Sequence, residues 1–210
     1  MLQGILIWAL PVVLAITVHE AAHGYVARAF GDPTAALAGR ITLNPLRHID
    51  PIGTIAVPLV LYLLSGTLFG WAKPVPVNFN RLRHPKADML WVAAAGPFSN
   101  LVMALGWACL AALLHGSALG SYGHGLTLMA GPGVAINGVL LFLNLLPIPP
   151  LDGGRITFSL LPDHLAKKYA RIEPYGFPIM LVLLATGGLG VILEPLLNGF
   201  MAALLRLFGN

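Results

Sequence analysis

The sequence predicts an all-α polytopic membrane protein with four to five transmembrane helices. Of its 210 residues, 57% are hydrophobic and only 10% are charged, and the mean hydropathy is +0.81. Soluble domains carry about 25% charged residues, so a chain this apolar belongs in a lipid bilayer. Apolar runs long enough to cross a membrane recur along the sequence, and we interpret residues 1–210 as a single domain.

Four long apolar stretches predict the main helices, at about 2–30, 87–115, 126–146 and 177–208. The last is longer than the ~20 residues of a simple crossing, and Pro195 is expected to kink it or to end the span. A further apolar segment, 51–71, is interrupted by Pro58, Gly66 and Gly70. We expect this segment to be re-entrant or interfacial.

The stretch His19-Glu20-Ala21-Ala22-His23 lies inside the first apolar helix. Histidines four residues apart share one helix face, so both imidazoles can reach one zinc ion. Glu20, beside them, is placed to take a proton from a zinc-bound water. A charge at membrane depth costs roughly 2.5–3.5 kcal/mol, and a metal site is the usual reason for one. An accidental match on a surface helix is the disfavoured alternative.

Zinc needs a third protein ligand, while a hydrolytic site keeps the fourth position open for water. Asp152 is the best candidate, because it follows an apolar helix end and a proline-rich break and precedes two glycines that permit close approach. The alternative is that Asp152 caps a helix beginning near Gly153. The remaining histidines are weaker candidates: His48, His84, His115, His124 and His164.

Three segments of the chain resemble the site-2 proteases, the intramembrane zinc metalloproteases. They are the HExxH of 19–23, the Gly-Pro-x-x-Asn of 96–100, and the run from Asn144 through Pro147 to Asp152-Gly153. Two further stretches, 39–46 and 71–77, resemble a compact bacterial and archaeal branch of that family. Unlike larger members, this chain shows no PDZ or CBS region.

The resemblance implies that His19, His23 and Asp152 bind one zinc ion per chain and that Glu20 is the catalytic base. Asn144 matches an asparagine near the metal, which contacts the substrate backbone or stabilises the oxyanion. The implied function is zinc-dependent cleavage of transmembrane helices. A metal-binding transporter or channel, and a non-catalytic homologue that binds membrane partners, stay open as alternatives. The intact Glu20 disfavours both, because a pure binder needs no base there.

Sharing one metal constrains the topology. Because the histidine pair lies near the end of the first helix and Asp152 follows the third, those helices must run parallel, with 87–115 returning between them. Segment 51–71 must then enter and leave on one side. This arrangement gathers the following basic residues on the same side: Arg28, Arg40, Arg47, Lys73, Arg81, Arg83, Lys86, Arg155, Lys167, Lys168 and Arg171. The positive-inside rule then predicts a cell-membrane protein with its active site toward the cytoplasm.

The loop 35–48 has partial strand character, because polar and apolar residues alternate over 40–44. We expect a short membrane-associated β-hairpin whose edge at 37–44 clamps an unwound substrate helix; a simple hairpin at the membrane surface is the alternative. The expected partners are a transmembrane protein substrate and the lipid bilayer. The net charge of +4 is spread over loops and predicts no nucleic-acid partner. The oligomeric state is left open.

Overall fold

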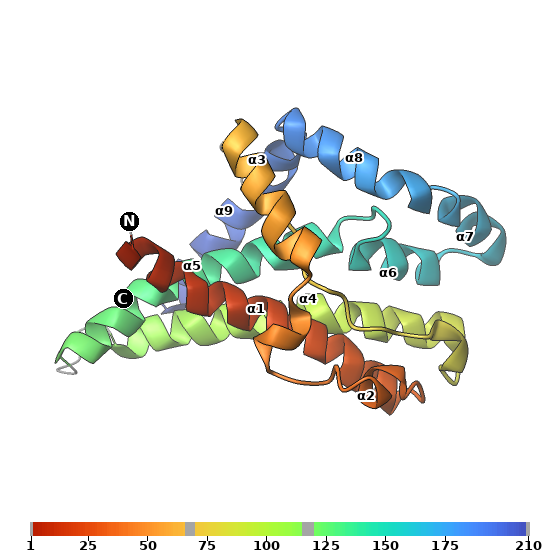
Figure 1. Ribbon diagram of the computed structural model, residues 1–210, viewed down its shortest axis with the longest axis horizontal. Coiled ribbons are helices and arrows are strands. Elements are labelled where there is room, and N and C mark those ends of the chain that lie inside the picture. The colour runs from red at the N-terminus through yellow and green to blue at the C-terminus, as the bar shows by residue number, and fades with distance from the viewer. Residues whose placement is uncertain (1, 66–69, 115–119, 209–210) are drawn as a thin grey trace.

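Three long helices form the centre of the molecule: α1 (Leu2–Ala29), α4 (Pro85–Leu114) and α5 (Gly120–Leu145). The computed structural model describes residues 2–65, 70–114 and 120–208. Helices α1 and α5 run in the same direction, and α4 runs back between them (Figure 1). The ends of α1 and α5 therefore lie at one end of the bundle, as a shared metal ion requires.

The central helices approach one another through small residues. Membrane helices commonly pack in this way, because lipid tails are as apolar as the side chains and close van der Waals contact drives their association. Ala15 of α1 and Ala104 of α4 are both fully buried. The ring of Trp107 in α4 lies against Gly133 of α5, in space that any side chain at position 133 would occupy. Close contact at these positions fixes how α1, α4 and α5 pack.

Four helical stretches are long and apolar enough to cross a membrane: Leu6–Ala29, Pro85–Leu114, Gly125–Leu145 and Gly188–Phe208. Their outer faces carry large apolar side chains; Leu113 is 73% exposed and Val191 is 76% exposed. Such an apolar exterior is suited to contact with lipid and not with water. The prediction of a helical, multi-pass membrane protein is confirmed.

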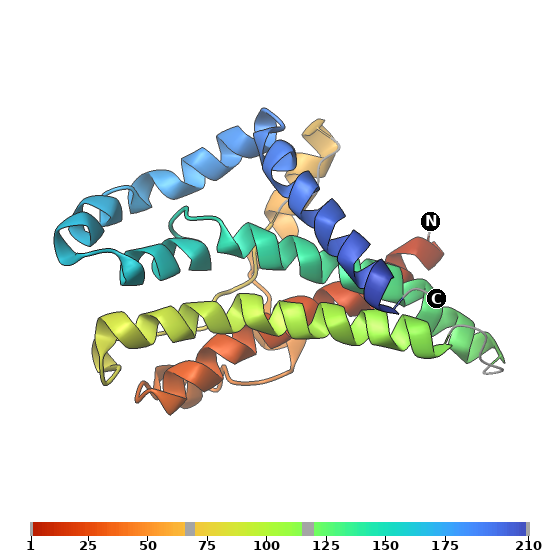
Figure 2. The ribbon, with the colours of Figure 1, turned by 180° about the vertical axis from the view of Figure 1, so that it is seen from behind.

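The predicted helix over 177–208 is in fact two helices, α8 (Glu173–Ala185) and α9 (Gly188–Phe208). The break lies at Gly187, whose φ of +74° is a conformation that L side chains rarely adopt. Of the two alternatives for Pro195, the end of the span was wrong, because Pro195 lies inside α9; the kink stays a prediction. Together α8 and α9 lead back to the end of the molecule where both termini lie (Figure 2).

The segment 51–71 folds back on itself. A π-helix, η2 (Pro51–Ala56), continues into α3 (Val57–Ser65), and residues 66–69 lie outside the described part of the chain. The amide of Trp71 then donates to the carbonyl of Gly53 at 3.0 Å. The two ends of the segment therefore meet, as expected for a chain that enters and leaves on the same side.

The β-hairpin predicted within 35–48 was wrong, because no strand forms anywhere in the described residues. A short helix, α2 (Thr34–Leu37), and a 3-10 turn, η1 (Pro45–His48), occupy this stretch. Asn44 caps η1, its side chain accepting a backbone hydrogen bond of 3.1 Å. Such local side-chain bonds close turns in place of a strand ladder. The clamp edge expected at 37–44 is therefore absent.

Residues 71–78, which we call the strap, form no helix or strand; the strap contacts α1 at Glu20 and Gly24 and leads into η3 (Phe79–Arg81). The strap is fixed by single hydrogen bonds to several elements and pairs with no strand in the described chain. These bonds are Lys73 N–H to His48 O at 2.9 Å, Arg40 Nη2 to Lys73 O at 2.9 Å, Val75 N–H to Glu20 Oε2 at 2.7 Å, and Asn78 N–H to Asp32 Oδ2 at 2.6 Å.

Two short helices follow α5 at the end of the bundle opposite both termini: α6 (Asp152–Leu160) and α7 (Asp163–Ala170). The chain reaches them through the proline-rich turn of 147–150. Arg28 in the last turn of α1 and Lys86 in the first turn of α4 lie toward this end as well. This end of the molecule therefore carries both the predicted ligands and many of its basic residues.

Candidate metal centre

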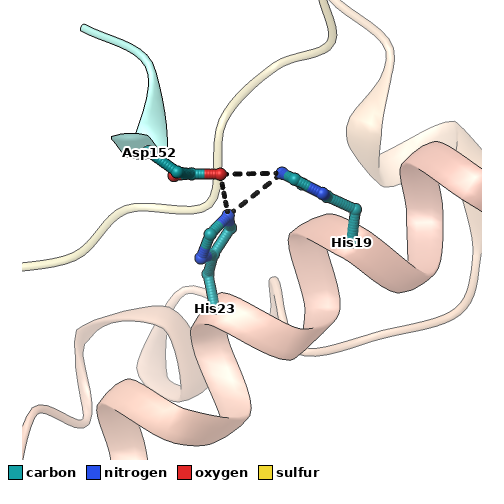
Figure 3. Close-up of side chains that lie close together, drawn as sticks. All are labelled: His19, His23 and Asp152. Atoms are coloured by element: carbon teal, nitrogen blue, oxygen red, sulfur yellow. Dashed lines mark hydrogen bonds and ion pairs between the residues drawn. The ribbon is translucent and has the colours of Figure 1, made fainter. Parts of the chain in front are cut away.

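The side chains of His19, His23 and Asp152 converge on one point (Figure 3). The two Nε2 atoms of the histidines are 3.1 Å apart. Oδ2 of Asp152 lies 3.2 Å from Nε2 of His19 and 3.3 Å from Nε2 of His23. No other group of three His, Cys, Asp or Glu side chains comes together in this way within the described chain.

Two helix ends bring these side chains together. His19 and His23 project from one face of α1, one turn apart. Asp152 is the first residue of α6, and the N-cap position before it is Leu151, which makes no side-chain capping hydrogen bond. The alternative that Asp152 serves as a helix cap was wrong, because its carboxylate points across to the imidazoles of α1 (Figure 3).

The backbone of α4 passes close to the imidazoles at Gly96. A Cβ atom there would lie 2.5 Å from Cε1 of His19 and 2.5 Å from Nε2 of His23. Any side chain would therefore enter the space that the ligand atoms share. This contact gives a physical reason for the glycine of the Gly-Pro-x-x-Asn stretch.

Hydrogen bonds to the other ring nitrogen fix the tautomer of each histidine. Nδ1 of His23 lies 2.7 Å from the carbonyl oxygen of Val92, which can only accept, so Nδ1 carries the proton. Nδ1 of His19 lies 2.6 Å from Oδ1 of Asn100, whose amide nitrogen donates elsewhere. In the neutral form of each ring, Nε2 therefore presents its lone pair to the centre, which is the form in which histidine binds a metal.

This arrangement fits a bound cation. Two unprotonated nitrogens and a carboxylate oxygen repel one another at 3.1–3.3 Å unless a positive charge lies between them. Oδ2 of Asp152 is buried and has no hydrogen-bond partner among the described residues. Two histidine nitrogens and one carboxylate oxygen are a ligand set typical of catalytic zinc, with a fourth position left for water.

A buried amide chain supports the His19 side of the centre. The side-chain amide of Asn100 donates to Oδ1 of Asn137 at 2.9 Å, and Asn137 in turn donates to the carbonyl of Gly133 at 2.8 Å. Asn100 and Asn137 are both fully buried. Sequence reasoning missed the role of Asn137, although an asparagine inside an apolar helix is itself a signal of function.

Glu20 and Asn144 line the same cavity of about 380 Å³ as the three converging side chains. Oε2 of Glu20 accepts a hydrogen bond from the amide of Val75 in the strap, at 2.7 Å. Nδ2 of Asn144 donates to the carbonyl of Leu140 in its own helix at 3.0 Å, which leaves its second N–H unassigned. Both predicted residues therefore line the cavity of the three converging side chains, and the strap contact of Glu20 was not predicted.

The weaker ligand candidates lie elsewhere. His48 is buried, and its Nε2 donates to the carbonyl of Thr42 at 3.0 Å. His84 and His164 are exposed on the surface. His115 and the side chain of His124 lie outside the described part of the chain.

The fold and the site together define a class of protein. A pair of histidines one helical turn apart, an aspartate from a second helix and an adjacent glutamate meet at one end of a bundle of membrane-crossing helices. This combination is typical of an intramembrane metalloprotease.

Comparison with known proteins agrees with that class. The sequence model of a family described as Peptidase family M50 matches residues 118–187. YwhC of Bacillus subtilis strain 168, whose name classes it as a zinc metalloprotease, is 42% identical over 199 residues, which are 93% of this chain and 88% of that protein. Rip2 of Mycolicibacterium smegmatis, named in the same class, is 31% identical over 178 residues, 84% of this chain and 65% of Rip2. No solved structure matches the chain.

The chain belongs to peptidase family M50, the site-2 proteases. The predicted class, a zinc metalloprotease embedded in a membrane, is thereby confirmed.

Proposed function

We propose that His19, His23 and Asp152 hold a single zinc ion and that Glu20 is the base with which this protease cleaves transmembrane helices of membrane proteins. One observation carries the proposal: three lone pairs converge on a buried point, and a carboxylate from the same helix turn lines the cavity beside them. Binding atoms and base then share one water-accessible space, which hydrolysis requires.

When bound, zinc supplies a Lewis acid that polarises the scissile carbonyl and lowers the pKa of water toward about 7. Glu20 takes a proton from the attacking water and returns it to the leaving amine. The amide of Val75 holds one carboxylate oxygen of Glu20 and so orients the carboxylate for both transfers. Asn144, on the cavity wall, donates to the substrate oxygen as negative charge develops there.

The substrate class follows from backbone chemistry. The carbonyls of a transmembrane helix are hydrogen-bonded within that helix, so the helix must unwind before a peptide bond reaches the cavity. Helices with Gly, Pro or Asn near the end that faces the site unwind at least cost. We expect such helices to be the preferred substrates.

We place the active site toward the cytoplasm. Basic residues gather at the metal-centre end of the molecule: Arg28 lies in the last turn of α1, Lys86 in the first turn of α4, and Lys167 and Lys168 in the last turn of α7. Cytoplasmic loops of membrane proteins carry an excess of Lys and Arg. The cell membrane is the bilayer that we assign on the same ground.

A transporter or channel, or a partner-binding homologue without activity, is not favoured. Either function would use the ligand cluster but would give no role to Glu20 or to the strap amide that orients it. Family membership points the same way.

Zinc content and cleavage test the proposal on the full chain in proteoliposomes. Wild type should bind one zinc per chain and cleave single-pass transmembrane peptides. Glu20→Gln should keep its zinc and lose cleavage, because a water-activating base is gone. Asp152→Ala should lose zinc, measured by elemental analysis, together with activity. Robust proteolysis by Glu20→Gln, or full zinc in Asp152→Ala, would contradict the assigned roles.

A further inference from the structure

A second cavity, of about 320 Å³, adjoins the metal cavity. The two share three wall residues: Phe79, Pro150 and Arg155. The outer cavity continues between η3, α4, α6 and α7, and is lined in part by the apolar side chains of Met89 and Phe158. The two cavities therefore border one another at these three residues.

Arg155 lies at that boundary with its hydrogen-bonding groups unused. Its guanidinium stacks over the ring of Phe79, 4.7 Å from the ring centre. No described residue forms a hydrogen bond or an ion pair with its side chain, although the residue is half-buried. Stacking holds the flat face of the group and leaves its N–H edges available, and a guanidinium offers five donors in a fixed plane.

The walls around Arg155 offer few backbone donors. Pro74 and Pro76 of the strap line the metal cavity, and Pro149 and Pro150 line the outer one. Proline has no N–H, and the amide of Val75, between Pro74 and Pro76, is already bonded to Glu20, so these walls offer few of the donors that a strand ladder with a bound peptide needs. An unwound substrate helix has carbonyls that have lost their internal partners, and in a membrane setting each of them needs a donor.

We propose that Arg155 donates to main-chain carbonyls of the unwound substrate next to the scissile bond, and that the outer cavity binds a bulky apolar side chain from the same stretch. This inference rests on the proposed proteolytic function. The guanidinium of Arg155 then holds the substrate backbone, in place of the edge strand expected from the sequence. The ring of Phe79 positions this guanidinium. Met89 and Phe158 give the apolar contact that selects Leu- or Phe-sized residues.

The backbone role is tested with Arg155→Met and Arg155→Gln in proteoliposomes, with a reconstituted single-pass peptide as substrate. Arg155→Met should raise KM about tenfold with zinc content unchanged, and Arg155→Gln, which keeps amide donors, should recover part of the loss. Arg171→Met is the matched control, because Arg171 is an exposed same-side cation that lines neither cavity. An unchanged KM in Arg155→Met, or an equal rise in the control, would overturn the role.

The apolar subsite is tested by specificity. A library of transmembrane peptides, varied at each position around the cleaved bond, is digested by wild type and by Phe158→Ala, and products are mapped by mass spectrometry. Phe158→Ala should shift the preference at one position toward a larger side chain, by about tenfold. Identical profiles would overturn the subsite and leave the proteolytic function standing. Zinc-loaded wild type that cleaves no library member would overturn the function itself.

Discussion

At the residue scale, the metal centre depends as much on what orients its ligands as on the ligands. His19, His23 and Asp152 supply the binding atoms, but Asn100 and the carbonyl of Val92 decide which imidazole nitrogen carries a proton. Removing such an orienting partner typically lowers metal affinity 10- to 100-fold. Asn100 is therefore a positioning residue whose effect is measurable on zinc binding alone.

We expect Asn100→Leu to lower zinc affinity by about 10- to 100-fold, because Nδ1 of His19 loses its acceptor and the Nε2 lone pair is no longer enforced. Competition with a fluorescent chelator measures this without any substrate. Ser99→Ala is the control, since Ser99 bonds only to the carbonyl of Gly96. Equal zinc affinity in wild type and Asn100→Leu would refute the positioning role.

We also expect Gly96→Ala to lose zinc, because the added methyl would enter the space between the two imidazoles. Gly106→Ala, on the same helix with open space around its α-carbon, should bind zinc as wild type does. Elemental analysis of both purified variants compares them directly. A fully zinc-loaded Gly96→Ala protein would contradict this prediction, because it would show that zinc binds with a methyl group beside the imidazoles.

At the element scale, the segment that lies beside the active site is the strap, and not the hairpin that the sequence predicted within 35–48. Alternation of polar and apolar residues over 40–44 resembles a strand, but a strand also needs a partner, and turn-forming bonds at Asn44 form instead. The proline-rich stretch 71–77, noted in the sequence only as a family resemblance, is the segment that reaches the active site. Pattern alone does not state which extended segment lies against which helix.

Asp32 anchors the end of the strap, and its titration gives a prediction. Burial alone would raise the pKa of this carboxyl, but hydrogen bonds from Thr34 and from the Asn78 amide outweigh it and lower the pKa. A lowered pKa contributes stability that is present above the unfolded value of about 3.9 and is lost as pH falls through the folded value.

The difference in free energy of unfolding between wild type and Asp32→Asn should therefore be constant from neutral pH to about pH 5 and narrow below about pH 4. Chemical denaturation in detergent, followed by circular dichroism, measures it. Using the difference between two proteins with the same metal centre cancels the effect of acid on the histidines. A difference in free energy of unfolding that stays constant to low pH would show that the charge of Asp32 contributes nothing to stability.

At the scale of the whole molecule, charge and topology agree. The metal-centre end holds Arg28, Lys86, Arg155 and the lysines of α7, whereas Arg206 lies in the last turn of α9, at the end of both termini. Because a charged segment crosses a bilayer only at high cost, we expect this asymmetry to orient the chain.

Cysteine labelling tests that orientation. Cys109 is the only cysteine, so Cys109→Ser gives a background in which Lys167→Cys and Arg206→Cys report separately. In intact cells, a membrane-impermeant maleimide should label Arg206→Cys from outside and should reach Lys167→Cys only after lysis. The opposite pattern would place the metal centre outside the cell.

The sequence predicted the three long central helices, the parallel run of the first and third, and the convergence of Asp152 with the histidine pair. The long helices followed from apolar length, the pairing of the histidines from helix periodicity, and the place of Asp152 from its proline- and glycine-flanked position and from the family resemblance. The parallel run then followed from the need of these residues to share one ion. The break at Gly187 was missed because the sequence does not reveal which glycine of an apolar run adopts a positive φ and ends the helix. Asn137 and Arg155 were missed because their roles depend on neighbours distant in the sequence.

The alternating prolines of the strap also bear on turnover. A protease that held peptides by a full ladder of main-chain bonds would retain its products as tightly as its substrates. Pro74 and Pro76 have no N–H, and four other strap amides are already bonded within the molecule: those of Trp71, Lys73, Val75 and Asn78. The strap therefore offers a severed fragment few backbone donors, and we expect each half of the cut helix to diffuse away readily into lipid or water.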